Sequence, residues 1–207
     1  MSARLGMVFV IDDDATVRKG LQRLLRSADY ESEAFASAEA FLERTTHPGP
    51  SCLVVDVQMP GLNGIDLQDA LLQRRRQEQL VFITGHGDIP MCARVMKAGA
   101  VDFLPKPFKP GELLRCIERA LARSAEQLHR SEAKNDVRRR LDTLTPREFE
   151  VMQLVSVGKL NKQVGGELGM AEKTVKVHRG RVMQKLGITS VAELVRLMEK
   201  AEVPPCR

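Results

Sequence analysis

The chain has 207 residues, of which 43% are hydrophobic, and it carries a formal net charge of +5 at pH 7. This length suits two ordinary domains, and the hydrophobic content is enough to build packed cores, which excludes a disordered chain. No apolar run approaches the ~18 residues of a membrane span, and the N-terminus lacks the pattern of a secretory signal, so we expect a cytoplasmic protein without a membrane partner.

The N-terminal half alternates short apolar runs with amphipathic stretches of helical periodicity. Five of these runs have the length and composition of β-strands, at residues 7–11, 31–35, 52–56, 80–84 and 101–105. Repeated strand–helix units predict an α/β fold with a doubly wound, five-stranded parallel sheet covered by helices on both faces. Ligands of such sheets bind beyond the carboxyl ends of the strands.

Chemically active side chains stand where these strands are predicted to end. They are Asp12 and Asp13 after the first strand, Asp56 at the end of the third, Thr84 at the end of the fourth and Lys106 after the fifth. Because the carboxyl ends of parallel strands meet at one edge of the sheet, we expect three carboxylates, a hydroxyl and an ammonium to converge there.

Three clustered carboxylates repel one another unless a cation joins them, and their oxygen atoms are typical ligands of Mg²⁺. A carboxylate held beside Mg²⁺ and a lysine can act as a nucleophile toward phosphorus and form an acyl phosphate. The alternative is structural: Asp12, Asp13 and Asp14 cap the first helix, and Asp56 caps the turn before Pro60. Asp14 fits that role, but five functional groups at one edge favour the chemical interpretation for the others.

The middle of the chain predicts a long helix. Between Gly111 and Thr145 there is neither glycine nor proline, and charged pairs recur at helical spacing. We therefore expect residues 123–141 to form a helical linker between an N-terminal domain of residues 1–122 and a C-terminal domain of residues 142–207.

The C-terminal domain is predicted to be small, all-α and basic. Thr145 with Glu148 and Ser190 with Glu193 have the spacing of capping boxes, and glycines separate four short helical stretches. The net charge is −1 before residue 123, whereas the linker and the C-terminal domain each carry +3. This distribution indicates that any polyanion binds in the second half, although a solvated basic face explains the charge alone equally well.

Four segments carry a resemblance to a known family. They are VFVIDDDATVR, CLVVDVQMPGLNGIDL, VFITGHGDIPMCARVMKAGAVDFLPKPF and GELGMAEKTVKVHRGRVMQKLGI. The chain resembles bacterial two-component response regulators of the FixJ type over nearly its whole length. The resemblance implies a flavodoxin-like receiver domain, a helical linker and a LuxR-type helix-turn-helix domain. It implies a DNA-binding transcriptional regulator, switched by phosphoryl transfer from a histidine kinase, and an activator as the commoner outcome in the family.

The resemblance also assigns roles in the receiver. Asp56 becomes the phosphoacceptor, while Asp12, Asp13, Asp56 and the backbone carbonyl of Gln58 hold Mg²⁺. Such a protein is not an enzyme, because it phosphorylates and dephosphorylates itself slowly at most.

A second group of receiver residues is assigned to the switch. Lys106 pairs with the phosphoryl group, Thr84 hydrogen-bonds to it, and Phe103 is the aromatic side chain that reorients. The family also implies a cis peptide between Lys106 and Pro107. Phe103 replaces the tyrosine of many relatives, so a switch step that uses a phenolic hydroxyl is absent. Homodimerisation on phosphorylation is expected, and RNA polymerase is a further candidate partner.

In the C-terminal domain the recognition helix is expected at about residues 172–185. By resemblance, its core-facing side chains are Val175, Val182 and Leu186. The candidates for contact with promoter DNA are Lys173, Thr174, Lys176 and Arg179 in the groove, and Lys162 and Arg181 near phosphates. The motif carries this assignment, since a single surface charge is usually only solvated.

Three residues depart from the usual motif. Gly165 and Gly166 stand where relatives generally have alanine, and each costs roughly 1 kcal/mol of helix propensity. Ala171 replaces a frequent serine cap. These losses predict a DNA-binding domain of lower stability than average.

Two other functions compete with the switched regulator. Phosphatases of the haloacid dehalogenase type also form an aspartyl phosphate after an apolar strand, but they place a general acid two residues later, where this chain has Gln58. A regulator that binds DNA regardless of phosphorylation is the second alternative, although the complete set of strand-end residues argues against it.

Overall fold

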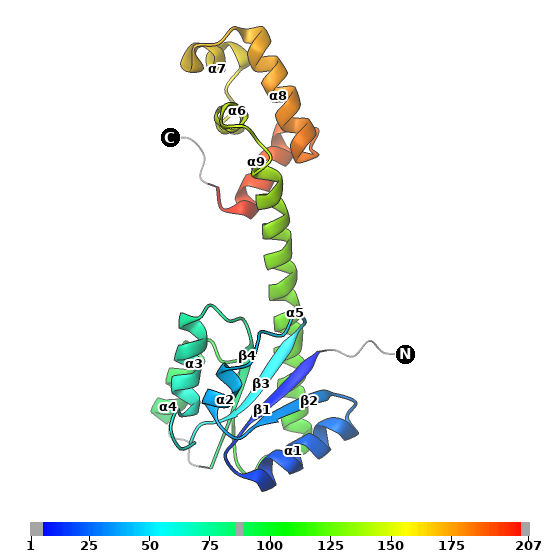
Figure 1. Ribbon diagram of the computed structural model, residues 1–207, viewed down its shortest axis with the longest axis vertical. Coiled ribbons are helices and arrows are strands. Elements are labelled where there is room, and N and C mark those ends of the chain that lie inside the picture. The colour runs from blue at the N-terminus through cyan, green and yellow to red at the C-terminus, as the bar shows by residue number, and fades with distance from the viewer. Residues whose placement is uncertain (1–5, 86–88, 204–207) are drawn as a thin grey trace. The chain divides into compact units, whose positions relative to one another are not determined.

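The computed structural model describes residues 6–85 and 89–203, and the chain divides into two compact units, Met1–Leu128 and His129–Arg207 (Figure 1). Among the described residues, no helix is both long enough and apolar enough to cross a membrane.

The N-terminal unit contains a five-stranded parallel sheet with the order β2-β1-β3-β4-β5. Its strands are β1 (Met7–Ile11), β2 (Glu31–Phe35), β3 (Ser51–Asp56), β4 (Gln79–Thr84) and β5 (Asp102–Pro105). The order reverses between β1 and β3, which is the topological switch point of a flavodoxin-like sheet. The predicted doubly wound fold is therefore confirmed, with every strand within one residue of its expected start.

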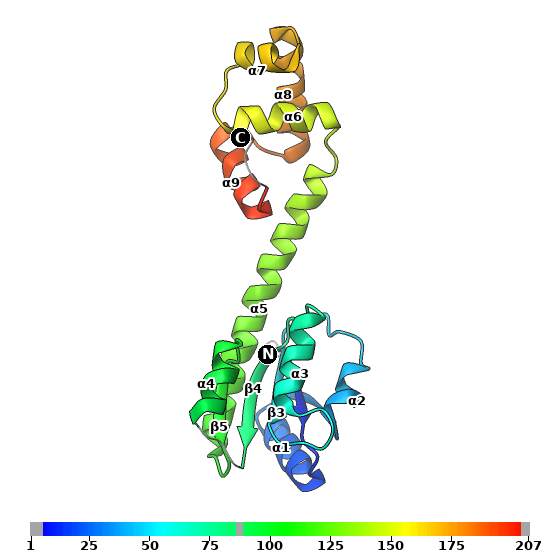
Figure 2. The same cartoon turned by 90° about the vertical axis from the view of Figure 1, so that its left-hand side faces the viewer.

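Helices cover both faces of this sheet because successive side chains of each strand point to opposite sides. The helices are α1 (Ala15–Ser27), α2 (Ala38–Leu42), α3 (Gly64–Gln73), α4 (Ile89–Lys97) and α5 (Pro110–Leu141). One core packs α1 and α5 against Val8 and Val10, and the other packs α2, α3 and α4 against Phe9 and Ile11. Figure 2 turns the layer of α2, α3 and α4 toward the viewer.

The burial of the strands follows from this layering. All residues of β3 and β4 are buried, which explains their nearly continuous apolar sequences, whereas β2 at the edge of the sheet is partly exposed. Asp56 and Thr84 are thus polar residues at the carboxyl ends of fully covered strands whose central residues are apolar.

The segment predicted as a linker is entirely helical, because it forms the last part of α5. Near its start, the Ser124 hydroxyl accepts a 3.0 Å hydrogen bond from the Ser51 backbone N–H in the first unit. Near its end, Val137 and Leu141 are buried in the core of the second unit.

The second unit is all-α. Besides the end of α5 it contains α6 (Pro146–Ser156), α7 (Asn161–Leu168), α8 (Glu172–Leu186) and α9 (Val191–Ala201). The capping box of Thr145 and Glu148 forms at the start of α6, as predicted. Ser190 also caps α9, but the Glu193 carboxylate accepts from the Thr189 backbone N–H at 2.8 Å, one residue before the position expected for a capping box.

Candidate functional site

The three predicted carboxylates converge at the carboxyl edge of the sheet. Asp12 follows β1 and Asp56 ends β3, and the parallel pairing of these strands places Ile11 beside Val55. One carboxylate oxygen from each of Asp12, Asp13 and Asp56 lies within 4.8 Å of the others. Asp12 is fully buried and Asp56 nearly so, whereas Asp13 is exposed and opens the cluster to solvent.

Lys106 brings its charge into this cluster. Its Nζ donates hydrogen bonds to Oδ2 of Asp12 at 2.8 Å and to Oδ2 of Asp56 at 2.7 Å. The Lys106 backbone N–H donates to the Thr84 carbonyl at 2.7 Å, which fixes the loop after β5 to the end of β4. The Lys106–Pro107 peptide is cis, as the resemblance implied.

Burial and hydrogen bonding shift the pKa values of Asp12 and Lys106 in opposite directions. Burial raises the pKa of Asp12, and the hydrogen bond from Lys106 offsets this only in part. For Lys106, burial alone would lower the pKa, but the hydrogen bonds to Asp12 and Asp56 raise it above its ordinary value. Lys106 therefore remains an ammonium at neutral pH.

The loop after Asp56 is shaped by close backbone approach. A Cβ atom on Gly64 would lie 2.5 Å from the Asp56 carbonyl oxygen, so this position requires glycine. Asn63 caps α3 by accepting from the backbone N–H groups of the two residues after Gly64. The Glu39 carboxylate accepts from the Leu62 backbone N–H at 2.9 Å and ties the same loop to α2.

Arg18 is a residue of this site that sequence reasoning missed. Its Nη1 donates to the carbonyl oxygens of Asp12 at 2.6 Å and Asp13 at 2.9 Å. Asp14 caps α1 by accepting from the Thr16 N–H at 2.7 Å, as expected. An arginine one helical turn after the cap was the available signal, because that spacing returns its side chain to the strand end.

Part of the structural alternative is also present. Asp12 Oδ1 accepts from the Asp14 N–H at 2.9 Å, and Asp56 Oδ1 accepts from the Gln58 N–H at 3.2 Å. These turn contacts use Oδ1 of each carboxylate, while Oδ2 of each accepts a hydrogen bond from Lys106.

The oxygens of the three carboxylates lie close enough together to form a donor set that suits Mg²⁺, so the residues fit the implied ion.

Thr84 and Phe103, the two residues assigned to the switch, differ from each other in burial. Thr84 is fully buried at the end of β4. Phe103 of β5 is half-buried and packs against the core on the side of α2, α3 and α4.

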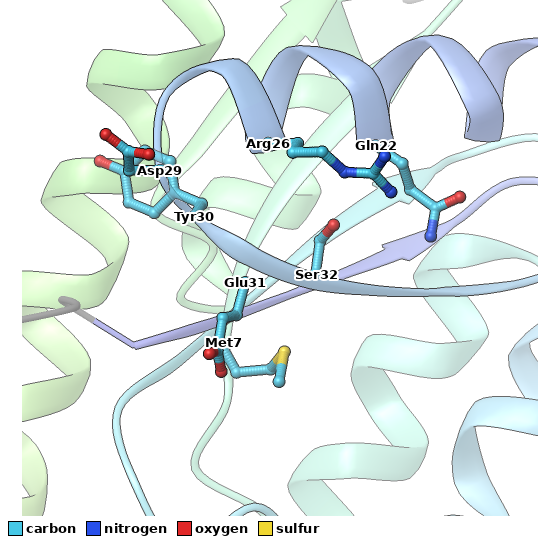
Figure 3. A pocket seen from close by; sticks show the side chains of 7 residues that line it. All are labelled: Met7, Gln22, Arg26, Asp29, Tyr30, Glu31 and Ser32. Carbon is cyan, nitrogen blue, oxygen red and sulfur yellow. The ribbon is translucent and has the colours of Figure 1, made fainter.

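A pocket of about 490 Å³ lies at the opposite edge of the sheet. In Figure 3, Arg26 and Gln22 of α1 lie over Ser32 of β2, near the amino ends of the strands. Because Asp12 and Asp56 stand at the carboxyl ends, this pocket is no part of the acidic site.

In the second unit, the candidate DNA-binding residues lie on α7 and α8. Five of them are exposed, namely Lys162, Lys173, Thr174, Lys176 and Arg181. Arg179 is half-buried and donates to Asn161 Oδ1 at 3.3 Å. The expected inward-facing set of α8 is confirmed, since Val175, Val182 and Leu186 are buried.

The turn between α7 and α8 gives Gly165 a role that helix propensity alone did not indicate. Gly165 is buried, its carbonyl accepts from the Met170 N–H at 2.9 Å, and a Cβ atom there would lie 2.6 Å from the Met170 carbonyl oxygen. Glycine at position 165 costs helix propensity, but it lets the Met170 carbonyl approach α7 closely and so permits the tight turn. Gly166 has no such role, because a Cβ atom there would meet no atom within 4 Å. Ala171 provides no side-chain cap, as expected.

An ion pair between the exposed Lys185 and the buried Glu148 joins α8 to α6. Lys185 Nζ lies 2.6 Å from Oε2 of Glu148 and also donates to the Thr143 carbonyl at 2.9 Å. Together with the N–H of Thr145, the ammonium lowers the pKa of Glu148 to about 2.

Comparison with known proteins identifies the family. Residues 8–118 match the response regulator receiver domain, and residues 142–198 match the bacterial regulatory proteins of the luxR family. The chain is a two-component response regulator. As the family consists of regulators with a DNA-binding domain, the phosphatase alternative is dismissed, and a histidine kinase and DNA are the partner classes that the two domains imply.

Individual relatives of this response regulator match over most of its length. Nodulation protein W of Bradyrhizobium diazoefficiens is 46% identical over 193 residues, which cover 93% of this chain and 85% of the relative. Response regulator protein TodT of Pseudomonas putida is 40% identical over 200 residues, covering 97% and 88%. The solved structure of response regulator StyR has a TM-score of 0.83 at 51% identity and covers 94% of this chain and 98% of its own. Full-length FixJ from B. japonicum has a TM-score of 0.57 at 36% identity, covering 98% and 100%.

Proposed function

We propose that this response regulator is cytoplasmic, that a histidine kinase phosphorylates Asp56, and that the phosphorylated form binds promoter DNA through α8 and activates transcription. The observation that carries the proposal is the position of Lys106 Nζ, which lies on Oδ2 of both Asp12 and Asp56 beside a third carboxylate.

The chemistry follows from these contacts. An Asp56 carboxylate oxygen attacks the phosphorus of the kinase phosphohistidine, the O–P bond forms as the P–N bond breaks, and the imidazole leaves. Lys106 moves from the carboxylate to a phosphoryl oxygen, where its ammonium offsets the negative charge. Asp12, Asp13, Asp56 and the Gln58 carbonyl would hold Mg²⁺, which neutralises phosphoryl oxygens when bound.

The switch uses Thr84 and Phe103. The Thr84 side chain moves toward the new phosphoryl group, and its hydroxyl forms a hydrogen bond with that group. Phe103 then turns inward into the space that the Thr84 side chain has left. This change alters the surface formed by α4, β5 and α5, where Arg119 forms an ion pair with Asp102. The altered surface promotes homodimerisation, so that two recognition helices bind DNA together, and RNA polymerase is the further partner at the promoter.

The DNA contacts divide into two groups. Side chains near the N-terminal part of α8 enter the major groove, and these are Lys173, Thr174, Lys176 and Arg179. Lys162 of α7 and Arg181 of α8 contact phosphates, which position the helix without reading the sequence.

Selection of bound fragments from fragmented genomic DNA tests this function. The full-length protein is used at fixed salt, with and without Mg²⁺ and beryllofluoride as a phosphoryl mimic, and Asp56→Asn is the control. Enrichment of particular fragments only with the mimic, and only by the wild type, supports the proposal. Equal enrichment in all samples supports the alternative regulator that binds DNA regardless of phosphorylation.

A further inference from the structure

The exposed face of α8 has an apolar centre that the proposed DNA contacts do not explain. Lys173, Val177, Gly180 and Gln184 follow at intervals of four, three and four residues, so they form one stripe along the helix. All four are exposed, and the buried side chains of α8 lie on the opposite side. Val177 is 48% exposed in the middle of this stripe.

A single exposed valine needs no explanation, but its neighbour one turn later makes the position unusual. Gly180 is exposed in the interior of α8, where glycine costs helix stability relative to alanine. A Cβ atom there would meet nothing within 4 Å, in contrast to the crowded Gly165. Nor does Gly180 have the positive φ that Gly169 and Gly187 need at their helix ends. Neither packing nor backbone conformation within the unit therefore requires glycine at this position.

The two residues together make a low apolar surface, which we call the apolar step, between the basic side chains of Lys173, Lys176 and Arg181. Those ammonium and guanidinium groups attract a polyanion, and the missing side chain of Gly180 lets it approach the helix closely. An apolar surface at the centre of a basic face needs an apolar partner on that polyanion. Base edges in the major groove offer one, the 5-methyl group of thymine.

We infer that Val177 and Gly180 form an apolar step that packs against the 5-methyl group of a thymine in the major groove, so that the bound sequence contains a T·A pair at this position. The inference rests on the proposed function and names one base pair of the target. Cytosine at the same place would leave its amino group without an acceptor against the valine, so the step discriminates against C·G as well.

Replacing thymine by uracil tests the contact, because it deletes only the 5-methyl group and keeps base pairing. The probes are duplexes of a fragment that the full-length protein selects from genomic DNA, each with one thymine changed to uracil. Wild-type protein with the phosphoryl mimic should bind one such duplex about fourfold more weakly, the factor expected for burial of one methyl group. Val177→Ala should bind the thymine and uracil forms of that duplex equally. Val157→Ala is the matched control, since this valine of the same unit is 43% exposed but lies outside α8.

Gly180→Ala provides a second test, because it should change protein stability and DNA affinity in opposite directions. The added methyl group should raise the unfolding temperature, because alanine favours the helix, and weaken DNA binding severalfold, because it fills the space that the DNA approaches. Gly20→Ala, in open space at an exposed position of α1, should raise stability without any effect on DNA binding.

Two results overturn the inference while leaving the proposed function intact. One is selective binding with no sensitivity to uracil at any thymine, and the other is the same sensitivity in Val177→Ala as in the wild type. A protein that selects no fragment under any condition contradicts the proposed function, and the inference falls with it.

Discussion

The ammonium of Lys106 lies 2.7 Å from Oδ2 of Asp56, although the two residues are 50 positions apart in the chain. This contact places the proposed nucleophile and its charge partner together before any phosphoryl group arrives. Asp56 is nearly buried, and the ammonium of Lys106 offsets its negative charge at the end of an apolar strand.

Asp56→Asn should abolish formation of the acyl phosphate, because an amide is no nucleophile toward phosphorus. The measurement is the amount of protein-bound phosphoryl label after incubation with labelled acetyl phosphate and Mg²⁺. Asp29→Asn is the control, since this exposed residue has a φ of 60°, which asparagine adopts readily. Label retained at equal stoichiometry on another residue of Asp56→Asn contradicts the assignment.

Lys106→Met should lower the free energy of unfolding of the first unit by about 2 kcal/mol at pH 7, because it leaves Asp12 and Asp56 as neighbouring, poorly solvated carboxylates. Mg²⁺ should then stabilise the variant more than the wild type, since the ion takes over the role of the ammonium. Thermal unfolding with and without Mg²⁺ measures both effects, with Lys109→Met as the exposed control. Equal stabilisation of the variant and the wild type by Mg²⁺ counts against this account.

Acid should weaken the second unit through Glu148. The pKa of this buried carboxyl is about 2 in the folded protein, below its ordinary 4.5, so its stabilising effect is complete above pH 4.5 and is lost as the pH falls toward 2. Glu148→Gln should therefore lower the free energy of unfolding by about 1–2 kcal/mol at pH 6, because solvent screens the exposed Lys185, and by roughly half as much at pH 3. Urea unfolding followed by circular dichroism measures the difference between wild type and variant at each pH. A difference that does not depend on pH would show that the Lys185–Glu148 pair is not the cause.

Two neighbouring glycines should respond to alanine with opposite signs. Gly165→Ala should destabilise the second unit by about 1–3 kcal/mol, because its Cβ atom collides with the Met170 carbonyl. Gly166→Ala should stabilise the unit by about 1 kcal/mol, because it only improves helix propensity. Urea unfolding of the two variants side by side makes the comparison, and stabilisation by both changes would disprove the tight turn.

The strands and the acidic cluster could be predicted because both follow from local patterns. Apolar runs that end on Asp56 or Thr84 predict buried parallel strands, and the topology of such sheets brings their ends together. The contacts of Arg18 and Gly165 could not be predicted with the same confidence. Each depends on where another backbone segment lies in space, and helix propensity alone gave Gly165 a purely destabilising role.

In the second unit, too, contacts between residues far apart in the sequence could not be predicted. The spacing of Thr145 and Glu148 predicted the capping box, but not that the same carboxylate would receive Lys185, which is 37 residues further along the chain. Val177 was another such case. The motif assigned the charged residues of α8 to DNA, and only the burial of its opposite side shows that an exposed valine lies between them.

The affinity of the full-length protein for a selected genomic DNA fragment, measured at fixed salt before and after incubation with acetyl phosphate and Mg²⁺, tests the central claim most directly. We predict that phosphorylation raises the affinity of the wild type about 10-fold or more, within the usual range of coupling between two sites, and leaves Asp56→Asn unchanged. Equal affinities of the wild type before and after incubation, or an equal increase in Asp56→Asn, would contradict a switch at Asp56.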